Sequence, residues 1–168
     1  MSQATIDENT AKEVANIEDL EFLKILIPEN VRLIPRELIE EVKGRLFTPD
    51  LFYDYQEKQL LYRNPGNLLY VLIDKDKKVH GYLWAEISQL DGSMFINTFS
   101  VNKDHWHKGK SLPYIMKHLE KLKNAHKCPR VFWITTNERF FLKHGFKRSK
   151  NVLMEYESDV SMTPSLRA

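Results

Sequence analysis

The sequence has a single cysteine, Cys128, so it cannot form a disulfide within one chain. It has no apolar run long enough to cross a bilayer, no internal repeat and no low-complexity tract. The polar, acidic start over residues 1–16 has no basic start followed by an apolar run, so we see no secretory signal. These absences argue against disulfide-rich scaffolds and repeat arrays, and we expect a cytoplasmic protein with no membrane partner.

The composition is that of one globular domain. The 168 residues are 42% hydrophobic and 29% charged, which supplies enough apolar material for a core. We expect a flexible arm over residues 1–16, a single domain over 17–157, and a flexible tail rich in Ser, Thr and Pro over 158–168.

The net charge of +2 is unevenly distributed along the chain. Residues 101–150 contain 13 Lys and Arg against three acids, whereas residues 1–60 contain 13 acids against seven Lys and Arg. This asymmetry favours an anionic partner for the C-terminal half, either nucleic acid or a phosphorylated cofactor. Solvated helix faces explain the lysines at positions 117, 121 and 123 equally well.

Hydrophobic periodicity predicts the elements of the N-terminal half. Residues 17–27 are apolar at mixed spacing, which leaves a short helix and a strand both open. Pro35 is expected to open a helix, followed by a second one over residues 50–62. The inner face of the first would consist of Leu38, Val42 and Leu46. The inner face of the second would consist of Leu51, Phe52, Tyr55 and Leu60.

After a turn at residues 64–67 the period becomes that of strands. We expect strands over 68–74, 79–88 and 94–101, joined by a charged tip at 74–78 and a turn at Asp91-Gly92. There follow a helix over 111–126, a strand over 130–135, a helix over 138–143 closed by Gly145, and a last strand over 146–156. The crossover helix makes strands 94–101 and 130–135 parallel. The predicted fold is therefore α+β, a mixed and mostly antiparallel sheet flanked by helices, with one parallel pair.

The segment that leads into the helix at Ser111 has the composition of an anion site. A loop is expected over residues 102–110, and its one glycine, Gly109, would let the backbone approach a ligand closely. Backbone amides of the loop and of the first helical turn favour negative charge, as does the helix dipole. The cations nearby are Lys103, Lys108 and Lys110. We therefore expect a phosphate-bearing ligand here. His105 and His107, one residue apart, have poor spacing for a chelate, so we expect no metal.

Three short motifs occur in an order typical of one known family. The first is Val79-His80-Gly81-Tyr82-Leu83. The second is Phe99-Ser100-Val101, followed by Trp106-His107-Lys108-Gly109-Lys110-Ser111. The third is Phe140-Phe141-Leu142-Lys143-His144-Gly145-Phe146. Together they resemble the GNAT superfamily of acetyl-CoA-dependent N-acyltransferases, over roughly residues 68–157.

The resemblance implies how acetyl-CoA, or another acyl-CoA, would bind. Its pantetheine arm would pair with the strand at Phe99, Ser100 and Val101 as if it were an additional strand. Its diphosphate would lie over the backbone amides of His107, Lys108, Gly109, Lys110 and Ser111. The acetyl group would pass to an amine-bearing acceptor, either a small molecule or a protein.

Two positions depart from the family's catalytic pattern. Phe141 stands where many members have the tyrosine that protonates the leaving thiolate, and Asn97 lies near the usual position of a catalytic glutamate. Phenylalanine has no proton to give, and an amide is no general base at neutral pH. The remaining candidates are Glu86 as base and Ser100 as donor to the thioester carbonyl. A solvent-facing glutamate and an ordinary strand serine are the alternatives.

Three functions fit these observations. The first is an acyl-CoA-dependent N-acyltransferase that works by proximity and oxyanion stabilisation. The second is a catalytically inactive protein of the same fold with a protein partner, for example a phage accessory or virion protein. The third is a nucleic-acid-binding module that uses residues 101–150. Nucleic acid ranks last because the segment lacks an ordered platform of aromatic and basic residues.

Overall fold

The computed structural model describes residues 16–41, 48–62, 64–108, 111–135 and 138–150, with the backbone alone over 106–108 and 111–112. The chain forms two compact units, Met1–Ile134 and Thr135–Ala168. The predicted arm up to residue 15, and the predicted tail, lie outside the described residues. So do Val42 and Leu46 of the first predicted helix.

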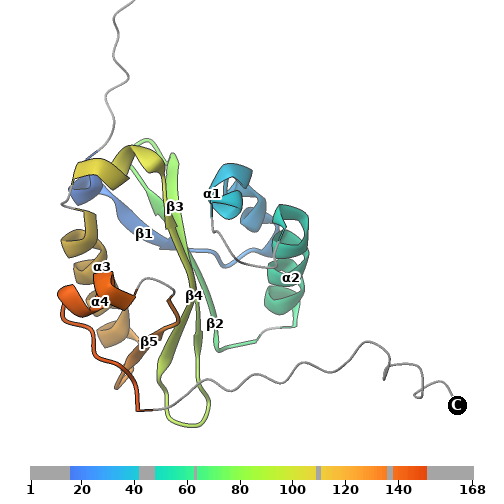
Figure 1. Cartoon of the computed structure of the whole chain (residues 1–168). Coiled ribbons are helices and arrows are strands. Elements are labelled where there is room, and N and C mark those ends of the chain that lie inside the picture. Colours follow the sequence, from blue (N-terminus) through green and yellow to red (C-terminus); the bar gives the residue numbers. More distant parts are fainter. Residues whose placement is uncertain (1–15, 42–47, 63, 109–110, 136–137, 151–168) are drawn as a thin grey trace, which may run out of the picture. The chain divides into compact units, whose positions relative to one another are not determined.

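The first unit is built on a five-stranded sheet. Its strands are β1 (Glu21–Lys24), β2 (Asn67–Ile73), β3 (Val79–Ile87), β4 (Met94–Val101) and β5 (Val131–Trp133). They lie in the order β1-β2-β3-β4-β5, and every neighbouring pair is antiparallel except β4 and β5. The predicted α+β class, with its single parallel pair, is confirmed (Figure 1).

Helices cover both faces of the sheet. The helical elements of this unit are the 3-10 segments η1 (Ile17–Asp19), η2 (Pro28–Leu33) and η3 (Lys103–Lys108), and the α-helices α1 (Arg36–Glu40), α2 (Pro49–Leu61) and α3 (Ser111–Ala125). Figure 1 shows α1 and α2 on one side of the sheet and α3 on the other. At the start of α2 the Thr48 hydroxyl accepts a hydrogen bond from the Leu51 amide at 3.4 Å, and Pro49 follows it as the first helical residue.

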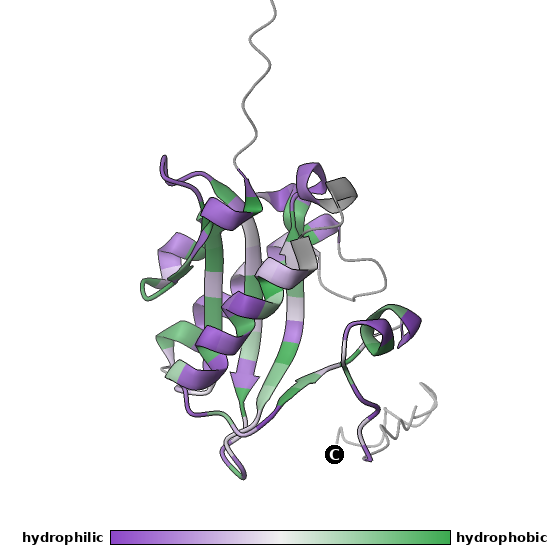
Figure 2. Ribbon diagram, turned by 90° about the vertical axis from the view of Figure 1, so that its left-hand side faces the viewer, coloured by the Kyte–Doolittle hydropathy of each residue, from purple (hydrophilic) through white to green (hydrophobic). Residues whose placement is uncertain are grey.

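Each face of the sheet carries its own hydrophobic core. Leu83 and Ala85 of β3 belong to the core beneath α3, and Tyr82 and Trp84 belong to the core beneath α1 and α2. This is the two-sided alternation expected of the strand. All of β2 is buried for the same reason, which explains its nearly continuous apolar sequence. Figure 2 looks onto the α3 side, where hydrophilic stretches of the helix alternate with hydrophobic ones.

A glycine allows β3 and β4 to approach closely near the end of the sheet where η3 begins. A Cβ atom at Gly81 would lie 2.6 Å from the carbonyl oxygen of Ser100, closer than real Cβ atoms come to other atoms. Gly81 pairs with Val101, the last residue of β4. The glycine of the first motif is therefore required by packing.

The structure corrects the sequence predictions in several places. Residues 17–27 contain both alternatives, η1 followed by β1. Leu51 is exposed, and Tyr53 is buried in its place with its hydroxyl donating to the Ile34 carbonyl at 2.7 Å. A phenol whose proton reaches a partner can be buried, which a ranking by hydrophobicity alone misses. The predicted loop over 102–110 contains η3.

The second unit contains α4 (Glu138–Lys143) and the residues after it. Gly145 has a φ of +88°, as expected of a glycine that ends a helix. The ring of Phe141 meets the rings of Phe140 and Phe146 edge-on. The last predicted strand is wrong over residues 146–150, which are not in a strand, and residues 151–156 lie outside the described residues. The local aromatic cluster holds Phe146 instead.

Candidate functional site

The candidate site is organised by a bulge in β4 at Asn97. Trp84 pairs with Thr98 and Ala85 pairs with Ile96, so Asn97 has no partner position on β3. The extra residue reverses the alternation of side chains along the strand. Before the bulge Ile96 points into the core under α3, and after it Phe99 does so.

Beyond the bulge, β4 has an open edge. β5 runs beside β4 only from Met94 to Ile96, whereas β4 continues to Val101. Among the described residues, no strand other than β5 pairs with β4 on that side. Where two parallel strands part in this way, backbone groups of the longer strand on that side are no longer paired with the shorter strand.

The register of the ladder shows which backbone groups face this edge. The Asn102 amide donates to the His80 carbonyl at 2.7 Å, and bonded positions alternate along an antiparallel pair. Phe99 falls at an alternate position, so its N–H and C=O point away from β3. Its ring meets Trp133 of β5 edge-on at 6.0 Å between centroids. The open edge therefore offers one donor and one acceptor at Phe99, which suits an amide-bearing chain.

The segment after β4 is fixed at its start by buried polar contacts. The His80 ring lies 2.7 Å from the Asp74 carboxylate through Nε2 and 3.3 Å from the ring of His105 through Nδ1. Both histidines are buried. The hydrogen bond from His80 lowers the pKa of Asp74, and the backbone amides of Lys78 and Asp76 act in the same direction. This chain ties η3 to the hairpin between β2 and β3.

A charged contact lies on the other side of η3. Lys103 Nζ is 3.6 Å from Glu41 Oε1, at the end of α1. The second oxygen of Glu41 is buried and accepts no hydrogen bond within the described residues. Together with the histidine chain, this contact holds the start of the segment that leads from β4 to the first turn of α3.

The predicted cofactor residues are brought together only in part. Phe99, Ser100 and Val101 lie on β4 as expected. His107 and Lys108 lie in η3, and Ser111 is the first residue of α3, but their side chains are not described. Gly109 and Lys110 lie outside the described residues. The structure thus shows the order strand, 3-10 turn and helix N-terminus, while the contacts of the loop stay a prediction.

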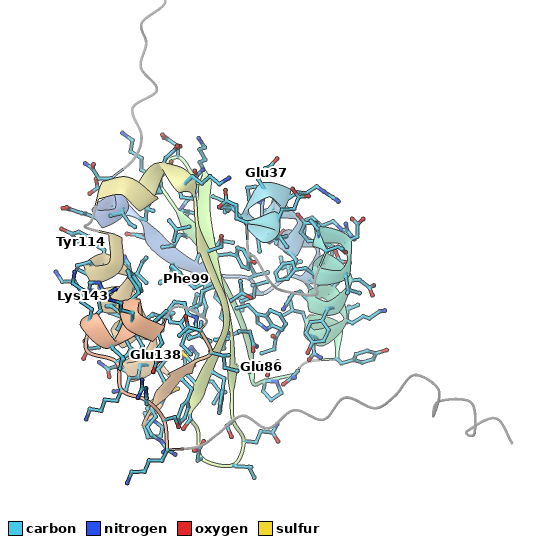
Figure 3. All side chains as sticks on the ribbon, viewed as in Figure 1. Glu37, Glu86, Phe99, Tyr114, Glu138 and Lys143 are labelled. Carbon is cyan, nitrogen blue, oxygen red and sulfur yellow. The ribbon has the colours of Figure 1, made fainter. Side chains whose placement is uncertain are left out.

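The two predicted catalytic residues do not form a pair. Ser100 is buried opposite Tyr82, on the side of α1 and α2. Glu86 faces the same side, but it lies four residues from Tyr82 along β3, which is about 13 Å at strand spacing. Figure 3 shows Glu86 and Phe99 on opposite sides of the sheet. Phe141 belongs to the second unit.

Sequence reasoning missed an aromatic pair beside Glu86. Phe95 pairs with Glu86 across the antiparallel ladder and with Phe132 across the parallel one. The two phenyl rings are stacked at 4.9 Å with an interplanar angle of 20°. Neither residue stands in a motif, and their neighbourhood depends on the register between β4 and β5. Only the alternation of Phe95 with the buried Met94 and Ile96 hinted at a separate face.

Other chemistry is limited in the described part of the chain. Its His, Cys, Asp and Glu side chains form no group of three or more placed to hold a metal ion. Cys128 is buried, and this burial raises the pKa of its thiol, as expected of an unreactive cysteine. Among the same residues, no helix combines the length and apolar character needed to cross a bilayer.

Comparison with known proteins identifies the fold. No protein-family model and no curated protein matches the sequence. Among solved structures, a possible acetyltransferase from Clostridium difficile 630 is 14% identical with a TM-score of 0.63, over 83% of this chain and 98% of that one. Glucosamine-6-phosphate N-acetyltransferase from Arabidopsis thaliana is 15% identical with a TM-score of 0.54, over 83% and 99%. An aminoglycoside N-acetyltransferase in complex with CoA is 13% identical with a TM-score of 0.59, over 82% and 94%.

These similarities, with the meander, the bulged strand and the single parallel pair, show that the chain has the fold of the GNAT superfamily. The resemblance found in the three sequence motifs is thereby confirmed at the level of the fold.

Proposed function

We propose that this protein is an acyl-CoA-dependent N-acyltransferase that moves an acetyl group to an amine acceptor. The observation that carries the proposal is the open edge of β4 beyond Ile96, in the same unit as the N-terminus of α3. Structural neighbours that are named acetyltransferases, one of them bound to CoA, support the same reaction class.

The residues of the edge fit the substrate expected of this fold. The pantetheine arm contains amide groups, and the N–H and C=O of Phe99 offer the matching donor and acceptor, respectively, of a strand-like pairing. The diphosphate would lie at the first turn of α3, where free amides and the helix dipole favour negative charge. His107, Lys108, Gly109, Lys110 and Ser111 are the residues proposed to hold it.

The chemistry asked of the protein is modest. The amine nitrogen bonds to the carbonyl carbon of the thioester, the carbon–sulfur bond breaks, and sulfur leaves as a thiolate that takes a proton from water. A neutral amine gives up one proton to a base or to solvent as the amide forms, and an acceptor that arrives as an ammonium gives up one more to a base or to solvent before it can attack. Positioning two reactants side by side supplies much of the rate enhancement in such reactions. A strand N–H near Val101, with the Ser100 hydroxyl as a further candidate, would stabilise the oxyanion.

One observation favours a second function, that of a catalytically inactive GNAT-fold protein with a structural or interaction role, such as a phage accessory or virion protein. Asn97 occupies the bulge, and its amide cannot accept the proton of an amine at neutral pH. An inactive protein would keep the fold without needing the open edge to bind a ligand.

Calorimetric titration with acetyl-CoA separates the two functions. The wild-type protein is expected to bind in the micromolar range, and Gly109→Asp is expected to lose binding because it adds a side chain and a negative charge at the diphosphate. Asn124→Asp is the matched control, since it adds the same charge at an exposed position near the other end of α3. Absence of binding to wild type at millimolar ligand would overturn the enzyme and favour the interaction protein.

A further inference from the structure

The stacked pair of Phe95 and Phe132 forms an exposed apolar surface on the first unit. It lies on the sheet face opposite α3, because Met94 and Ile96, the neighbours of Phe95, point into the core under α3. Phe95 is 40% exposed, although α1 and α2 bury much of the same face nearby. We call Phe95, Phe132 and the adjacent Glu86 the ledge.

The ledge carries one negative charge that no cation of the described residues neutralises. Glu86 is half-buried opposite Phe95 and takes part in no ion pair there. The Arg130 guanidinium stands over the ring of Phe132, 5.2 Å from its centroid. Arg130 is already paired with Asp91 at 2.9 Å. The local charge left over is therefore that of the Glu86 carboxylate.

A second effect of the Glu86 charge appears on α2. Burial raises the pKa of the Tyr55 hydroxyl, and the negative charge of Glu86 acts in the same direction. Tyr55 also packs beside Trp84, its ring centroid 5.3 Å from that of Trp84. The Glu86 carboxylate is thus within electrostatic reach of the Tyr55 hydroxyl on α2 and lies opposite the exposed ring of Phe95, so a group bound beside it meets negative charge and an aromatic face.

We propose that the ledge binds the acceptor as a primary alkylammonium group. Aromatic rings present a negative face that attracts cations, and the carboxylate attracts the same charge. The two effects disfavour an anionic acceptor and give a neutral one no advantage. The face of Phe95 that is not stacked on Phe132 would accommodate the methylene groups next to the nitrogen.

The position of the ledge fits this role. Phe95 lies two residues before the bulge at Asn97, and Phe132 lies one residue before the last pair that joins β5 to β4. An amine on the ledge would therefore lie beside the point where the open edge begins. The role as acceptor site rests on the proposed function, whereas ammonium binding at the ledge does not.

The test uses 1,4-diaminobutane as probe, with 1,4-butanediol as its neutral counterpart and no acyl-CoA present. Backbone amide shifts are followed by NMR in the full chain. Saturable shifts at Glu86, Phe95 and Phe132 are expected with the diamine and not with the diol. Glu86→Gln is expected to weaken the apparent affinity by about tenfold because it removes the charge and keeps the shape.

Two further variants complete the design. Phe95→Ala is expected to weaken binding through loss of the exposed aromatic face. Glu120→Gln, at an exposed position on α3, removes the same charge elsewhere and is expected to change nothing. Equal shifts with diol and diamine, or undiminished binding in Glu86→Gln, would overturn the inference.

Failure of this inference is distinguishable from failure of the proposed function. If acetyl-CoA binds and the diamine does not bind to the ledge, the proposed transferase function is kept and the inference is overturned. If the diamine binds as described and acetyl-CoA does not, the ammonium site is supported and the transferase is lost.

Discussion

His118 and His126 are partly buried side chains of the segment from α3 to β5, and each has an aromatic neighbour. His118 meets Phe22 edge-on at 5.3 Å, and His126 Nε2 lies 2.9 Å from the hydroxyl of Tyr70. Burial lowers the pKa of both rings, and the nearby cations Lys121 and Lys24 add to the effect. The folded protein therefore prefers both rings neutral.

This preference predicts how stability depends on pH. Below about pH 6.5 the unfolded chain takes up protons that the folded chain resists, so the free energy of unfolding falls as the pH drops from about 7 through the lowered folded-state pKa values. Urea denaturation at several pH values measures it. The variant His118→Gln/His126→Gln should lose less stability on acidification than wild type.

The control for this prediction is His144→Gln, at an exposed position in the second unit. It should follow the wild-type pH dependence, since carboxylate titration is common to all three proteins. Identical curves for the double variant and wild type would show that the two partly buried rings have the same pKa in the folded and the unfolded chain.

At the scale of elements, a buried chain of hydrogen bonds joins α2 to the sheet. Trp84 Nε1 donates to the Asn67 side-chain oxygen at 2.8 Å, and the Asn67 side-chain nitrogen donates to Gln56 at 3.0 Å. All three residues are buried. The side-chain amide of Asn67 therefore links β2 to both β3 and α2.

Replacing this amide should loosen the helix from the sheet. Asn67→Leu removes the acceptor of the indole N–H and the donor to the Gln56 side-chain oxygen, and the loss of these buried hydrogen bonds costs about 1–3 kcal/mol of unfolding free energy. Urea denaturation measures the loss. Leu90→Ala, at a position 98% exposed, should stay within about 0.5 kcal/mol of wild type. Equal stability of the two variants would contradict a structural role for Asn67.

The sequence predicted elements well where periodicity and turn residues agree. The bounds of β4 and the start of α3 at Ser111 were predicted to the residue, and the helix expected over 50–62 begins at Pro49. The register between β3 and β4 could not be predicted, because nothing in the sequence indicates that Asn97 has no partner position on β3. The ledge depends on that register, so the motifs pointed to Glu86 but not to its aromatic neighbours.

At the scale of the whole molecule, the uneven charge has a measurable consequence. Positions 101–150 contain 13 basic residues, and Lys103, Lys108 and Lys110 are close in sequence to the residues proposed to hold the diphosphate. Exposed charges attract an anionic ligand less as salt screens them. The charge pattern could be read from the sequence, but which lysines face the ligand depends on side chains outside the described residues.

Acetyl-CoA affinity should therefore fall with salt. We expect a decrease of about fivefold between about 50 mM and about 300 mM salt, measured by calorimetry. S-acetylpantetheine, which lacks the phosphates, is the matched control and should bind with little salt dependence. An equal salt dependence for the two ligands would show that the basic segment does not act on the phosphates.

The bulge in β4 also bears on how this chain can change over evolutionary time. A substitution at Asn97 leaves the strand's two halves in place, whereas deletion of that one residue would restore simple alternation and exchange inside for outside along the rest of the strand. Thr98 and Ser100 would then enter the core under α3, and Phe99 and Val101 would leave it. We expect related chains to vary freely in side chain at this position while keeping the length of the strand fixed.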